Sequence, residues 1–139
     1  MSEKKKKLKF IIIGTIIFLL IIGLFFCLNK PDTLSEEFAG TYESGIGSSV
    51  VYFSVDKVKN NEFFYTDQEN QIYIKGKVIP ITEDIYEITC DSLEAKDIIA
   101  VQKIQYQNQS FRLIASDQEK IFKKVDELPI LFCDLKNYK

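Results

Sequence analysis

The stretch from Phe10 to Leu28 constrains this chain more than any other part, because it holds nineteen residues without a charge, mostly Ile, Leu and Phe. As a helix it would be about 28 Å long, close to the roughly 30 Å hydrocarbon core of a bilayer. A cleaved secretory signal usually has an apolar region of only about 7 to 15 residues, followed by small residues. Bulky Phe25 and Phe26 stand there instead. We therefore predict a retained transmembrane helix at residues 10–28. Its expected anchoring side chains are Phe10, Ile11, Ile12, Ile13, Phe18, Leu19, Leu20, Leu24, Phe25 and Leu28.

Five lysines precede the apolar run, with one acidic residue, Glu3, among them. Positive residues close to a membrane span stay on the cytoplasmic side. The sequence therefore predicts a basic cytoplasmic tail at residues 1–9, a single pass through the cell membrane and an extracytoplasmic C-terminal part. The lysines that carry this topology signal are Lys4, Lys5, Lys6, Lys7 and Lys9.

The remaining chain divides into a short polar stretch, 29–37, and a domain, 38–139. The polar stretch contains Pro31 and has no apolar period, so we expect a linker. Beyond residue 28 there are 13 basic and 19 acidic residues, a net charge of −6. An acidic domain repels nucleic acid, and no nucleic-acid partner is expected.

Histidine is missing from all 139 residues. This excludes Ser-His and Cys-His nucleophile pairs and imidazole ligands for zinc or haem. Paired carboxylates remain the one route to catalysis without a cofactor, as in glycosidases. Glu83, Asp84 and Glu87 are the candidates, but they fall in a turn and on the polar face of a strand. We expect solvated surface there, no enzyme activity, no cofactor and no metal site.

Apolar residues beyond the linker recur with a period of two, which is typical of strands. The expected strands lie at 40–44, 49–59, 62–67, 71–79, 84–90, 98–106, 110–116 and 118–125. Turns follow every eight to twelve residues, so the fold class is all-β: a transmembrane helix followed by a seven- to eight-stranded antiparallel meander that closes into a small barrel or sandwich.

Particular residues predict how these strands connect. Asn60-Asn61 tolerates positive φ and suits a hairpin turn, and residues 107–109 indicate a second hairpin. Gly76 predicts a bulge or bend within its strand. Residues 91–97 are either a polar connection or one turn of helix. The tail from residue 126 ends as a short helix or a final strand, with its apolar residues completing the core.

Cys90 and Cys133 both lie in the part expected outside the membrane, where an oxidising setting could join them. Two separate buried thiols are the other reading. Cys27 lies within the apolar run and packs there as a small hydrophobe, or serves as a lipid attachment site.

Two resemblances bear on the chain. Leu24 and Cys27 are spaced as in a bacterial lipoprotein signal, although Phe26 stands where that signal has a small residue. Gly40-Thr41-Tyr42 resembles the G-x-W motif that opens lipocalin-like barrels, with Tyr in place of Trp. The resemblance to small bacterial lipocalin-like extracytoplasmic proteins covers roughly residues 38–125. It implies a barrel whose first aromatic ring plugs one end and a domain that binds something rather than transforming it.

Tyrosines on the outer faces of strands provide the best material for a binding surface, since their rings stack on sugars or on a partner protein. We therefore expect a membrane-anchored binding module for a partner protein, an envelope component or a small hydrophobic ligand. The alternative is an accessory subunit of a membrane complex that acts through its helix. The surface residues singled out are Tyr52, Tyr65, Tyr73 and Tyr86.

Overall fold

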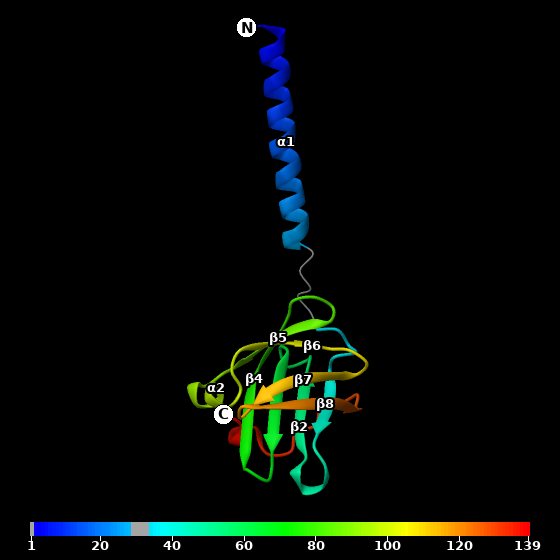
Figure 1. The fold of residues 1–139 in the computed structure, drawn as a ribbon, viewed down its shortest axis with the longest axis vertical. Coiled ribbons are helices and arrows are strands. Elements are labelled where there is room, and N and C mark those ends of the chain that lie inside the picture. The colour runs from blue at the N-terminus through cyan, green and yellow to red at the C-terminus, as the bar shows by residue number, and fades with distance from the viewer. Residues whose placement is uncertain (1, 29–33) are drawn as a thin grey trace. The chain divides into compact units, whose positions relative to one another are not determined.

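The computed structural model describes residues 2–28 and 34–139, which fall into two compact units with the division at residue 30. The first unit is a single helix, α1 (Glu3–Leu28), with no buried residue (Figure 1). It is long and apolar enough to cross a membrane. The predicted span 10–28 lies inside it, and the helix begins earlier because lysine is a good helix former.

Part of the predicted linker lies outside the described residues, namely 29–33. The rest of it belongs to the second unit, because Leu34 is buried there and Ser35 lies within hydrogen-bond distance of the Tyr86 hydroxyl. Residues 34–39 therefore form part of the folded domain.

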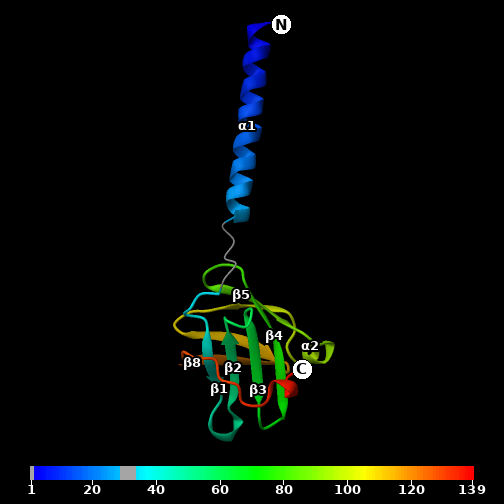
Figure 2. The same ribbon diagram turned by 180° about the vertical axis from the view of Figure 1, so that it is seen from behind.

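The second unit is an eight-stranded antiparallel sheet that curls into a nearly closed barrel (Figures 1 and 2), as the alternation predicts. Its strand order is β6-β5-β4-β3-β2-β1-β8-β7. The strands are β1 (Gly40–Ser44), β2 (Val51–Asp56), β3 (Glu62–Asp67), β4 (Ile72–Pro80), β5 (Ile85–Cys90), β6 (Gln102–Gln105), β7 (Ser110–Ala115) and β8 (Gln118–Asp126). A short 3-10 helix, η1 (Gly47–Ser49), lies between β1 and β2.

The barrel closes where β1 pairs with β8, with Tyr42 opposite Lys124. The register shifts between Thr41 and Tyr42, where β8 has one extra residue, Val125, so a bulge bends β8 at this join. Gly40 comes just before it with φ 137°, where a Cβ would collide with the Asp126 carbonyl. The glycine of the Gly40-Thr41-Tyr42 motif is therefore required by the close approach of two strands.

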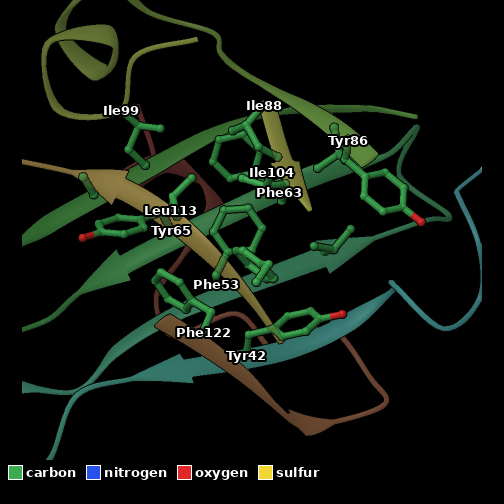
Figure 3. Close-up of a cluster of buried hydrophobic side chains, with 14 of the residues drawn as sticks. Tyr42, Phe53, Phe63, Tyr65, Tyr86, Ile88, Ile99, Ile104, Leu113 and Phe122 are labelled. Carbon is green, nitrogen blue, oxygen red and sulfur yellow. The ribbon is translucent and has the colours of Figure 1, made fainter. Parts of the chain in front are cut away.

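Aromatic rings fill the barrel interior (Figure 3). Phe53 stacks on Phe63 with ring centroids 4.8 Å apart, and Phe111 stacks on Phe122 at 5.3 Å. Tyr42 is fully buried and donates its hydroxyl hydrogen to the Phe38 carbonyl at 2.7 Å. Because these rings stack on one another and the Tyr42 hydroxyl has a hydrogen-bond partner, the interior is a packed core.

The predicted turns form as the residue types require. Asn60 and Asn61 have φ values of 57° and 59°, and Asn108 has 52°. Gly76 is different, because the strand pairs on both sides of it show no register shift. A Cβ there would collide with the Phe63 ring and the Thr89 carbonyl, so the predicted bulge is wrong and the glycine permits close packing instead.

A short helix, α2 (Leu93–Ile98), occupies the connection after β5. Ser92 caps it by accepting a hydrogen bond from the Ala95 N–H at 3.1 Å. Because the helix ends at Ile98 and Ile99 then inserts into the core, β6 begins only at Gln102, four residues later than the alternation predicts.

The C-terminal tail, residues 127–139, lies across the outer face of β1, β2 and β3 (Figure 2). It contains a 3-10 helix, η2 (Leu135–Asn137), and otherwise follows an irregular path. The predicted end of the chain as a helix or strand is thus only partly correct. The expectation that its apolar residues complete the core is wrong, because Ile130 and Leu131 are exposed and the tail covers the barrel from outside.

Candidate functional site

The four tyrosines singled out from the sequence do not form one exposed surface. Tyr65 and Tyr86 are buried in the barrel, at 0% and 1% exposure, which corrects their expected outward placement. Tyr65 pairs in register with the inward Phe53, and the Tyr86 hydroxyl donates to the Glu83 carbonyl at 2.8 Å. Burial raises the pKa of both phenols above its ordinary value, so both stay neutral.

Tyr52 and Tyr73 are half-buried because the tail covers them. Tyr52 stacks on Phe132 with centroids 4.0 Å apart, and Tyr73 meets Tyr138 edge-on at 5.9 Å. Both rings therefore contact the protein's own C-terminal tail.

The tail is held by polar as well as aromatic contacts. Thr41 Oγ1 donates to the Leu128 carbonyl at 2.7 Å and accepts from the Ile130 N–H at 2.9 Å. Ser54 Oγ donates to the Ile130 carbonyl at 2.6 Å. Burial beneath the tail explains why two polar residues on the outer side of a sheet are almost inaccessible to water.

All three cysteines are free thiols. Cys90 Sγ contacts the Ile99 carbonyl at 3.4 Å, and Cys133 Sγ contacts the Asp134 carbonyl at 3.6 Å. No disulfide joins Cys90 to Cys133 in the structure. Burial raises the pKa of the Cys90 thiol to about 11, so it is protonated and unreactive at neutral pH.

The candidate carboxylates lie at the surface. Glu83 and Asp84 are exposed in the turn before β5, and Glu87 is half-buried on β5 opposite Lys103. Within the described ranges, His, Cys, Asp and Glu nowhere gather in a group of three that could hold a metal ion.

β6 and β7 are the two ends of the strand order, and no ladder joins them in the described barrel. These strands are consecutive, and the turn between them begins as a hairpin: Gln107 N–H donates to the Ser110 carbonyl at 2.9 Å and the reverse bond is 3.1 Å. This pair, Gln107 and Ser110, is an isolated bridge, and β6 and β7 form no ladder beyond it. We call the facing stretches Gln102–Gln105 and Ser110–Ala115 the seam.

The register shows which backbone groups face the seam. Tyr106 N–H donates to the Asp84 carbonyl, so alternate residues of β6 point toward β5, and Lys103 and Gln105 point into the seam. By the same alternation along the β7–β8 ladder, Arg112 and Ile114 point into it from the other side.

A side chain takes the place of the missing ladder at one position. The Gln102 carboxamide donates to the Ile114 carbonyl through Nε2 and accepts from the Ile114 N–H through Oε1, each at 2.9 Å. These are the two bonds that a residue of an antiparallel strand would make with Ile114. The edge of β7 thus already binds an amide group.

A surface cleft of about 540 Å³ opens along the seam. Buried Ile104 and Phe111 line its inner side, while exposed Lys103, Arg112 and Ile121 line its rim. The two rim cations have no carboxylate among the lining residues, and the one partner of Arg112, Glu119 at 3.2 Å, is an exposed pair of little strength. Lys103 in turn lies opposite Glu87 on β5, so each rim cation has a carboxylate neighbour.

Sequence reasoning missed the seam because the residues 107–109 predict an ordinary hairpin, whose strands would pair fully. The shortness of β6, set by α2 and Ile99, is the local reason that the strands separate. Comparison of the chain with family models, with curated proteins and with solved structures gives no match, so the fold and the seam are described from this chain alone.

Proposed function

We propose that the chain is a membrane-anchored binding module of the bacterial cell envelope, whose barrel lies outside the cytoplasmic membrane and recognises a partner protein through its surface. The observation that carries the proposal is the filled interior: Tyr42, Phe53, Phe63, Phe111 and Phe122 occupy the space that a small hydrophobic ligand would need. Recognition is therefore assigned to the outside of the barrel.

The exposed surface supports this assignment at the seam. Ile121, which lines the cleft, is 48% exposed, and Ile114, two residues after Arg112 on β7, is 54% exposed. Apolar side chains flanked by charged ones are typical of a surface that contacts another protein. The proposed function contains no catalytic step.

The resemblance of Gly40-Thr41-Tyr42 to the lipocalin-like motif fits a binding role and remains part of the proposal. The orientation rests on the five lysines before the span. Protease applied to intact cells should remove the barrel and leave a fragment that contains α1. Survival of the whole chain, with cleavage only after the cells are lysed, would overturn the orientation.

Photo-crosslinking in cells that make the chain tests the binding role. A photoreactive residue placed at Gln105 or Ile121, in the full-length protein, should give a discrete adduct with one other protein. The same residue at Val58, which is 94% exposed on the β2–β3 turn, is the control and should give none. Equal labelling from all three positions would contradict a defined binding surface.

Replacing α1 by an unrelated transmembrane helix separates this function from the accessory-subunit alternative. A module that binds through its barrel keeps its adducts after the exchange. Loss of the adducts, with the barrel still folded and in the membrane, would instead assign the contact to the helix.

A further inference from the structure

We propose that the seam binds an extended peptide segment of the partner, which adds as a strand to the edge of β7 and moves the Gln102 carboxamide, together with the short strand β6 that carries it, away from that edge. This inference rests on the proposed function and identifies the ligand of that surface. It requires that the segment carry an aliphatic residue followed, two positions later, by an acidic one.

The backbone of β7 supplies the first part of the argument. Arg112 and Ile114 both direct their N–H and C=O groups into the seam, and the spacing of two matches the repeat of a strand. Only Ile114 has a partner there, the Gln102 carboxamide. A peptide residue opposite Ile114 would make the same two bonds, and a second residue would pair with Arg112.

The side chains of β7 determine what the peptide must carry. Residues two apart on a strand share a face, and directly opposite residues on paired strands are in contact. Arg112 would therefore meet one peptide side chain and Ile114 another, both on the outer face, where Ile114 is 54% exposed. A carboxylate opposite Arg112 and an aliphatic chain opposite Ile114 are the complementary choices.

The charge of Arg112 favours the same ligand. Its pair with Glu119 is exposed enough for a peptide carboxylate to compete with it. If the added strand continues the antiparallel order of this sheet, the residue opposite Ile114 precedes the one opposite Arg112. The expected order is aliphatic, any residue, acidic.

Other edges of the sheet are less suited to this role. The first half of β4, before β5 joins it, is paired with the tail, through bonds from Lys75 N–H to the Lys139 carbonyl at 2.9 Å and from Lys139 N–H to the Tyr73 carbonyl at 3.0 Å. This half of β4 is therefore occupied, whereas no backbone bond to Arg112 is present in the seam of the described barrel.

The test uses the full chain in detergent micelles and an end-blocked, fluorescent peptide, Thr-Thr-Val-Thr-Glu-Thr-Thr, with binding followed by anisotropy. Two matched peptides accompany it, one with Lys in place of Glu and one with an N-methyl group on the valine amide. We expect the first to bind about tenfold more weakly, from the lost charge pair, and the second not at all, because it cannot donate to Ile114.

Variants of the chain test the same contacts from the protein side. Gln102→Ala should tighten binding of the Glu peptide by about fivefold, because the peptide no longer competes with the carboxamide. Arg112→Glu should reverse the preference toward the Lys peptide. Gln118→Ala, an exposed position on β8, and Lys96→Glu, an exposed position on α2, are the controls and should leave both affinities unchanged.

Three results would overturn the inference. Equal binding of the N-methylated peptide would show that no strand is added. If folded Gln102→Ala bound the Glu peptide with unchanged affinity, the carboxamide would not compete with the peptide for Ile114. Dimerisation of Gln102→Ala without peptide binding would assign the edge to a second copy of the chain.

Failure of this inference can be distinguished from failure of the proposed function. If crosslinks at Gln105 and Ile121 persist while the peptide does not bind, strand addition is wrong and the proposed function stands. If the crosslinks themselves are missing, the proposed function fails.

Discussion

Two sides of the barrel differ in whether the chain covers its own sheet. Over β1, β2 and β3 the chain covers its own outer face with the tail, and Thr41, Ser54 and Thr66 are buried by it. Between β6 and β7 the sheet stays open, and one carboxamide occupies a single position of the edge. The first arrangement uses up hydrogen-bonding groups within the molecule, whereas the second leaves them available to another chain.

The comparison predicts that changes under the tail cost stability and changes in the seam do not. Tyr138→Ala should have the largest effect, because the ring is 5% exposed, packs on Phe64 and Tyr73, and lies 2.9 Å from Thr66 Oγ1 through its hydroxyl. We expect a loss of about 3 kcal/mol in the free energy of unfolding, measured by urea titration. Tyr138→Phe keeps the ring and should lose about 1 kcal/mol. Equal losses in the two variants would show that packing of the ring contributes nothing.

Thr41→Val removes the hydroxyl that holds Leu128 and Ile130, and it keeps the shape of the side chain. Two backbone groups of the tail lose their partner, so we expect a loss of about 2 kcal/mol by thermal or urea unfolding. Thr89→Val on β5 is the control, because no side-chain hydrogen bond of Thr89 is present in the described barrel. A cost no larger than the control's would mean that the tail is not held through Thr41.

Alkaline pH should lower the free energy of unfolding through groups buried in the barrel and not through the seam. The Cys90 thiol has a pKa raised by burial to about 11 from an ordinary 9.0, so the unfolded chain loses this proton first. The contribution is complete below pH 9 and falls as pH rises toward 11, by about 1 kcal/mol at pH 10. Unfolding free energies at pH 8 and pH 10 measure it, and Cys90→Ala should show a smaller decline between them. An identical decline would assign it to other groups, such as the buried phenols.

Gln102→Ala should have the smallest effect on stability, below about 1 kcal/mol, because its bonds lie at an exposed edge where water replaces them. Amide hydrogen exchange should nonetheless quicken at Ile114, which loses its acceptor. If this variant destabilised the barrel as much as Tyr138→Ala, the seam would be a structural join and the contrast between the two sides would disappear.

The strands could be predicted from the sequence because the alternation is local and the turn residues are chemically specific. Asn60 and Asn61 adopt positive φ as expected, and each of the eight strands overlaps its expected range, although β6 begins four residues later. What could not be predicted depends on contacts between residues far apart in the chain. Phe64 lies on the outer face of β3 and looks solvent-facing by alternation, yet it is buried because Tyr138 packs on it.

The seam could not be predicted for a related reason. Alternation assigns Gln102 and Ile114 to strands but gives no sign that a side chain of one would bind the backbone of the other. The burial of Tyr65 and Tyr86 was missed because Tyr is apolar along its ring and polar at its tip, so a strand can place it on either face. Both outcomes follow from how the strands pack.

The join between β1 and β8 has a mechanical consequence. β1 follows directly on the segment 34–39 that leads into the barrel, and it is hydrogen-bonded along both sides, to β2 and to β8. Tension applied along the chain from its N-terminal side therefore loads a central strand in shear, where many hydrogen bonds must break together. The seam between β6 and β7 does not lie on that line of force, so its few bonds do not resist the pull.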